Sequence, residues 1–157
     1  MYNGGVLRST RILATAACAL LVLAAASDVA AAPTLSKPQF KRRANAICAS
    51  AHAKVLRVAP LYPIARTAKI GDKWLKIDRD ALAALRAITP PASERARVRR
   101  LLALTDKTIN TGLADLVKAA KAGNKSKYNS ASRRFTTLLI ASHKAAGDYG
   151  LPACFSW

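Results

Sequence analysis

Acidic residues are scarce in this chain of 157 residues, which has 8 Asp and Glu against 26 Lys and Arg and a net charge of +18. No two carboxylates have the arrangement of a hydrolytic pair, and no Gly-x-Ser-x-Gly elbow or phosphate-binding Gly-rich loop occurs. The sequence does not exclude a Ser-His-Asp triad, because the geometry of its side chains defines a triad and their spacing along the chain does not. The chain has 3 cysteines and 1 methionine, without a Cys-x-x-Cys-His sequence for attaching haem. We therefore expect a protein that is not an enzyme and has no cofactor.

Apolar runs long enough to span a membrane, about 20 residues, are also missing. The longest uncharged apolar run, Ile12–Ala26, follows two arginines and precedes a stretch of small residues. This order is typical of a signal peptide. We expect residues 1–32 to be such a peptide, cleaved after Ala31 or Ala32, with an uncleaved anchor as the alternative. The mature protein is then secreted or associated with the cell envelope, without a transmembrane helix.

Cleavage would leave residues 33–157 as a single domain with two cysteines, Cys48 and Cys154. An exported protein folds in an oxidising compartment, where an even number of cysteines indicates a disulfide. We therefore expect Cys48 and Cys154 to be bonded and the C-terminal tail to be held by that bond.

Hydrophobic residues recur at spacings of three and four in four segments, and no segment alternates with the period of two that a strand requires. Turn and capping residues delimit the segments, among them Ser36, the pair Gly71-Asp72 and the pair Pro90-Pro91. The segment Leu61–Ile70 fits either a short helix or an irregular crossing. The pattern predicts four helices, at about 36–58, 72–88, 93–122 and 128–149.

Short connections favour antiparallel neighbours, so the expected fold is all-α, an up-down-up-down four-helix bundle stapled by one disulfide. The fourth helix would return the tail toward the first half of the first helix, where Cys48 lies. Phe155 and Trp157 would then cover the open end of the core. The expected bulky core residues are Phe40, Trp74, Tyr128, Phe135 and Tyr149.

Three short motifs resemble a loosely defined family of small secreted helical proteins of unknown function from high-GC Gram-positive bacteria. These are Asn45-Ala-Ile-Cys-Ala-Ser-Ala-His52, Thr89-Pro-Pro-Ala92 and Tyr149-Gly-Leu-Pro-Ala-Cys154. The resemblance implies a helical fold and a disulfide, and it implies no activity. This chain departs from the family pattern in its His52, where Asn is usual, and in its basic surface, where relatives tend to be acidic.

Basic residues crowd the first turns of the first and third helices, where the helix dipole makes cations mildly unfavourable. Stability alone would not select this placement, although solvation of an exposed face would also account for part of the charge. In the expected topology both helix starts lie at the same end of the bundle. We expect an anion-binding surface for an envelope polymer or lipid headgroups, formed by Lys37, Lys41, Arg42, Arg43, Arg95, Arg97, Arg99 and Arg100.

A second hypothesis is a structural or sensory bundle that holds a small ligand or metal near Cys48, His52 and His143. With Cys154, these residues would supply the two thiolates and two imidazoles of a tetrahedral zinc site. No Cys-x-x-Cys or His-x-x-x-His pair supports zinc, and an exported protein oxidises its thiols, so no metal is expected. Nucleic acid is also an unlikely partner, because export and the absence of a recognised reading motif argue against it.

Overall fold

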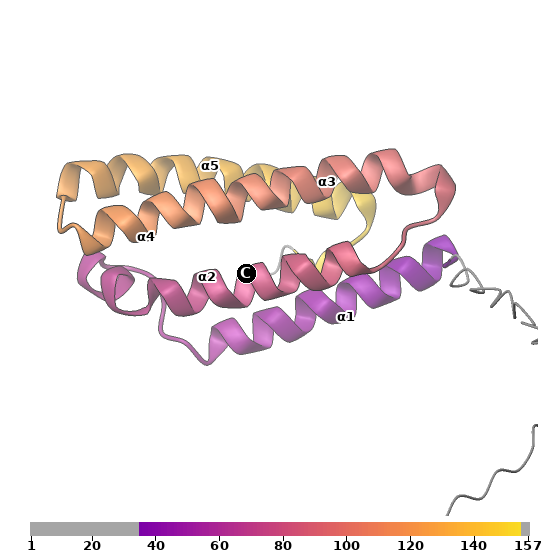
Figure 1. Cartoon of the computed structure of the whole chain (residues 1–157), viewed down its shortest axis with the longest axis horizontal. Coiled ribbons are helices and arrows are strands. Elements are labelled where there is room, and N and C mark those ends of the chain that lie inside the picture. Colours follow the sequence, from indigo (N-terminus) through magenta and orange to yellow (C-terminus); the bar gives the residue numbers. More distant parts are fainter. Residues whose placement is uncertain (1–34, 155–157) are drawn as a thin grey trace, which may run out of the picture. The chain divides into compact units, whose positions relative to one another are not determined.

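The computed structural model describes residues 35–154, and all regular structure among them is helical (Figure 1). The all-α prediction is confirmed for this part of the chain. None of its helices is long and apolar enough to cross a membrane. The chain divides into two units after Ala32, and the second of these is described here by itself. The expected signal peptide, residues 1–32, and the expected contacts of Phe155 and Trp157 lie outside the described residues.

Helix α1, Lys37–Leu56, begins with a capping box, as the sequence predicts. The Ser36 hydroxyl accepts a hydrogen bond from the Gln39 amide at 3.4 Å, and the Ser36 amide donates to Gln39 Oε1 at 2.9 Å. Two of the amides that a helix start leaves without partners are thereby satisfied.

Helix α2, Ile64–Ala87, begins eight residues before the expected start at Asp72. The expectation that Gly71-Asp72 interrupts the chain is therefore wrong, and most of the ambiguous segment Leu61–Ile70 is helical. Gly71 serves packing instead, since a Cβ built there would lie 2.5 Å from Val117 Cγ2. The glycine lets α2 approach the helix that carries Val117 at a distance that a side chain would prevent.

The predicted third helix is one helical stretch with an irregular centre. A 3-10 turn, Ala92–Glu94, precedes α3, Arg95–Lys107, and a π-helical segment, η2, Thr108–Leu113, joins it to α4, Ala114–Lys121. The sequence analysis did not predict the π segment. Such segments insert extra backbone into a helix and are frequent at functional sites.

Helix α5, Lys125–Tyr149, has Asn124 as its N-cap and ends at Gly150, whose φ of 87° is left-handed. Glycine adopts this conformation without the steric penalty of a Cβ. The chain therefore turns sharply at Gly150, and the short helix η3, Pro152–Cys154, lies against α1.

The helices pack in pairs: α1 lies beside α2, while α3 and α4 lie beside α5 (Figure 1). The α2 helix also packs against α4, whereas α1 meets η3 rather than α5 as its second main neighbour within the described chain. The start of α1 reaches the start of α3, where Lys37 Nζ lies 2.6 Å from Glu94 Oε1.

Two clusters of buried apolar side chains form the core. We name them the α4 cluster and the tail cluster after the elements that anchor them. The α4 cluster contains Leu61, Leu75, Leu82, Ile109, Leu113, Leu116, Val117, Ala119, Ala120, Tyr128, Ala131 and Phe135. The tail cluster contains Phe40, Ala44, Val98, Leu101, Ala146, Tyr149 and Leu151. Four of the five predicted bulky core residues belong to these clusters, and the fifth, Trp74, is only half-buried.

Candidate functional site

A cavity of about 350 Å³ is lined by residues of both core clusters. Its walls come from α1, α2, α3, η2, α5 and the C-terminal tail, and they include side chains of both clusters. The exposed residues Pro60, Tyr62 and Thr136 also line it, which places its mouth between the segment after α1 and the middle of α5. The volume falls in the range of small-molecule sites, roughly 300–1,000 Å³.

The apolar face of α2 is the wall on one side of the cavity. Trp74, Asp78, Ala81 and Leu85 recur there at spacings of three and four. Trp74 is fixed by a hydrogen bond of 3.2 Å from its indole Nε1 to the Ala59 carbonyl. The periodicity of this stripe predicts a buried helix face, and Asp78 places one carboxyl group on it.

Asp78 and His143 each present an unpartnered polar atom in this region. The Oδ1 atom of Asp78 and the Nε2 atom of His143 are inaccessible to solvent and have no hydrogen-bonding partner in the described part of the chain. Both residues line the cavity, Asp78 from α2 and His143 from α5. Burial raises the pKa of Asp78 to about 7 and lowers that of His143. Both groups therefore favour their uncharged forms.

Three hydroxyl groups of the cavity wall donate hydrogen bonds to backbone carbonyls. Thr105 Oγ1 donates to the Leu101 carbonyl at 3.0 Å, and Ser142 Oγ donates to the Leu139 carbonyl at 3.0 Å. Thr108 Oγ1 donates in the same way to Leu104 of its helix, at 2.9 Å. The protons of these three hydroxyls are engaged by the backbone, and among the described residues of the wall Asp78 and His143 are those with a buried polar atom that has no hydrogen-bonding partner.

Basic side chains are absent from the lining, although Lys and Arg are abundant in the chain. Among residues 35–154, none of those that line the cavity is Lys or Arg. The cavity therefore offers an organic anion no countercharge, and it offers apolar molecules a large contact surface.

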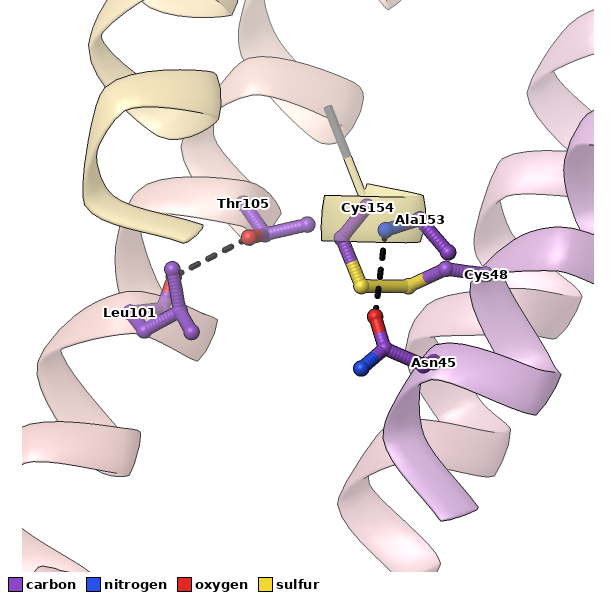
Figure 2. The surroundings of a disulfide bond; sticks show 6 residues. All are labelled: Asn45, Cys48, Leu101, Thr105, Ala153 and Cys154. Atoms are coloured by element: carbon purple, nitrogen blue, oxygen red, sulfur yellow. Dashed lines mark hydrogen bonds between the residues drawn. A yellow bond between two sulfur atoms is a disulfide. The ribbon is translucent and has the colours of Figure 1, made fainter. Parts of the chain in front are cut away.

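The predicted disulfide is present and belongs to the cavity wall; Figure 2 shows the bond and its surroundings. Cys48 on α1 and Cys154 in the tail are bonded with a Cα–Cα distance of 4.9 Å, and both line the cavity. The Asn45 side chain reinforces this attachment, because its Oδ1 accepts a hydrogen bond of 3.1 Å from the Ala153 amide. Figure 2 shows Leu101 and Thr105 of α3 across from the bond.

The residues of the sequence-based ligand hypothesis are brought together only in part. Cys48 and His143 line the cavity, whereas His52 is not among the lining residues. The disulfide engages both cysteines, so neither is a thiolate that could hold zinc. In the described part of the chain, no group of three or more His, Cys, Asp or Glu side chains is placed to hold a metal ion.

The basic residues at the starts of α1 and α3 converge on Tyr149. Lys41 Nζ lies 5.3 Å and the Arg97 guanidinium 5.2 Å from the centre of its ring, both within cation–π range. Arg97 also donates to the Asp148 carbonyl at 2.7 Å. The ammonium of Lys37 holds the pKa of Glu94 below its ordinary value. Three of the eight expected anion-binding residues are thus engaged in contacts within the protein.

The other five side chains of that set are exposed, and within residues 35–154 they make no ion pair: Arg42, Arg43, Arg95, Arg99 and Arg100. A surface with several unneutralised guanidinium groups can bind phosphate or carboxylate oxygens in a bidentate manner.

Asp78 is not among the site residues expected from the sequence, although the pattern around it contains a signal. Asp78 follows Trp74 by four residues and precedes Ala81 by three, so the helical period places an acid on an apolar face. Acids are almost never buried without a partner, which makes such a residue a candidate for function.

Comparisons with known proteins add no relative from which a function could be transferred. No family model, curated protein or solved structure matches this chain.

Proposed function

We propose that this protein is an exported, non-enzymatic helical module that binds a small, mainly apolar molecule in the cavity lined by residues of both core clusters. The observation that carries the proposal is the cavity itself, about 350 Å³ in volume and lined mostly by apolar side chains. A small-ligand site near Cys48 and His143 is also the second hypothesis from the sequence. In the proposed site, Asp78 takes the place of His52.

Packing density supports a binding role. Protein interiors are normally packed as closely as organic crystals, and voids larger than a water molecule are few. The disulfide and the Asn45 hydrogen bond hold the tail at the edge of the cavity, so the wall is fixed by a covalent bond rather than by packing alone. A rigid, preformed apolar cavity with few polar groups is typical of small-molecule sites.

Filling the cavity should abolish binding of an apolar probe. Ala81→Phe projects a ring from the α2 wall, whereas Ala83→Phe places the same ring on the exposed face of that helix. With octanol at a hundredfold excess over its Kd, the unaltered protein and Ala83→Phe should melt about 10 °C higher than without octanol. Ala81→Phe should show little shift while keeping its helical circular dichroism.

Equal shifts for both variants would place octanol outside the cavity and contradict the proposal, as would the absence of any shift in the unaltered protein. Isothermal titration calorimetry on the same three proteins measures the Kd directly.

A second candidate function is binding of an anionic envelope polymer or lipid headgroups by the basic starts of α1 and α3. The Lys37–Glu94 ion pair favours it, because that contact brings the two helix starts together. The same contact supports the up-down-up-down order of the helices, in which α1 and α3 run in parallel. Exposed cations gathered at one end would attract polyanions, and salt would screen them over about 8 Å at physiological ionic strength.

Removing the exposed cations of this end should weaken binding to anionic vesicles more than removing as many elsewhere. The test changes Arg42, Arg95, Arg99 and Arg100 together to Gln, and spares Arg97 because it packs on Tyr149. We expect affinity for phosphatidylglycerol vesicles at low salt to fall roughly a thousandfold, since each of the four basic residues contributes about 1 kcal/mol near an anionic surface. Vesicle co-sedimentation measures the loss.

The matched control neutralises four exposed lysines that make no ion pair within residues 35–154: Lys73, Lys118, Lys125 and Lys127. Equal losses in the two variants would mean that only net charge matters and that this end holds no site.

A further inference from the structure

We infer that the molecule held in the cavity is uncharged and mainly apolar, and that it carries a hydroxyl group that hydrogen-bonds to the Asp78 carboxyl. This inference rests on the proposed function and adds the chemical class of the ligand. It comes from four features of the wall: the placement of Asp78, its protonation, the unpartnered atom of His143 and the absence of basic side chains.

Asp78 is the only acid of the cavity wall among the residues described. Its carboxyl group makes no hydrogen bond and no ion pair within residues 35–154, although Asp is almost never buried unpaired. A ligand without polar groups would leave this carboxyl unsatisfied. A ligand with a hydrogen-bonding group would satisfy it, so the wall discriminates between the two.

The surroundings of Asp78 favour a protonated carboxyl group. Among residues 35–154, no Lys or Arg side chain lines the cavity and no hydrogen bond reaches Oδ1 of Asp78. Burial accordingly raises its pKa to about 7, so most molecules carry the proton in weak acid. A protonated carboxyl donates one hydrogen bond and accepts others, which matches the mixed donor and acceptor character of a hydroxyl group.

His143 adds a second unpartnered atom, from α5. Its Nε2 either donates or accepts according to the tautomer, and a hydroxyl group is compatible with both. The hydroxyls of Thr105, Thr108 and Ser142 do not compete as donors to the ligand, because each donates its proton to a backbone carbonyl.

Charged ligands fit the cavity less well. An anionic ligand would lie near the Asp78 carboxyl, and no Lys or Arg of the described wall would neutralise its charge. A cation would have to be desolvated together with an ionised Asp78, and for buried pairs this penalty can exceed the Coulombic gain. The net charge of +18 also repels cations from the protein as a whole.

Four probes with the same octyl chain test the head group: octanol, octyl chloride, octylammonium and octanoate. At pH 6, calorimetry should give octanol the lowest Kd, roughly tenfold below that of octyl chloride. A factor of this size corresponds to the net contribution of about one hydrogen bond. Both ions should bind more weakly than octanol. The emission of Trp74 should change on binding, measured in Trp157→Phe, because Trp74 lines the cavity.

Asp78→Leu should bring the Kd of octanol close to that of octyl chloride and leave octyl chloride binding unchanged. Asp78→Asn keeps a hydrogen-bonding group of similar size and should retain the preference for octanol. Asp80→Leu, on the exposed side of the same helix, should behave as the unaltered protein does.

Each other outcome overturns a definite statement. Equal binding of octanol and octyl chloride would refute the hydroxyl group and leave the cavity function standing. Tightest binding of octylammonium would make Asp78 a cation site and refute the uncharged ligand. Failure of all four probes would refute the cavity function together with this inference.

Discussion

Replacing Cys154 with Ser is expected to lower the free energy of unfolding by about 4–5 kcal/mol. The bond joins residues 106 positions apart, and in the chain-entropy model a loop of about 100 residues is worth roughly 4.7 kcal/mol. This is a large share of the 5–15 kcal/mol that stabilises a typical domain. Urea denaturation of Cys154→Ser, Cys48→Ser and the double variant measures the change.

The double variant provides the internal control, because both single changes remove the same bond. Its loss should match the single losses rather than their sum. Protease cleavage near Gly150 should also become faster, since only non-covalent contacts, among them the Asn45–Ala153 hydrogen bond, then hold the tail to α1. Alkylation of the unreduced, unfolded protein should modify neither Cys48 nor Cys154. Labelling of both in most molecules would show that the bond does not form.

The second large effect is a dependence of the free energy of unfolding on pH, which we expect Asp78 to cause. Its pKa is raised from 3.8 to about 7, so between these values the folded state holds a proton that the unfolded state has lost. Stability must therefore fall as pH rises from about 4 to 7, and level off above 7. Between pH 5 and pH 7 the loss is at most about 3 kcal/mol, since each pKa unit corresponds to 1.36 kcal/mol.

Asp78→Asn should remove this loss and make the protein more stable than the unaltered chain at pH 8. His143, on the facing wall, acts in the opposite direction, because its lowered pKa makes stability fall as pH drops below about 6.5. The control is Asp80→Asn, an exposed acid paired with Lys76 at 2.8 Å, which should leave the pH profile unchanged. Urea denaturation from pH 4 to 8 is the measurement. A profile for Asp78→Asn that parallels the unaltered protein would contradict the buried, proton-holding carboxyl.

Local signals in the sequence determined the all-helical class and most helix ends. Ser36 and Gln39 form the predicted capping box, and Gly150 has the left-handed backbone that a helix end favours. The disulfide was predictable from the even number of cysteines that cleavage would leave. These features depend on groups within a few residues of one another or on chemistry common to a compartment, so the sequence alone is sufficient.

Only the tertiary structure decided where the helices approach one another and where they do not. The sequence predicts a helix break at Gly71, but Gly71 lies inside α2. Val117 of α4 occupies the space that a side chain at this position would need. Helical periodicity places Asp78 as an exception on an apolar face, but its significance depends on a cavity that seven segments of the chain line. Contacts between residues far apart in sequence set both outcomes, and helical periodicity specifies the face of a helix without specifying how closely a neighbour packs against it.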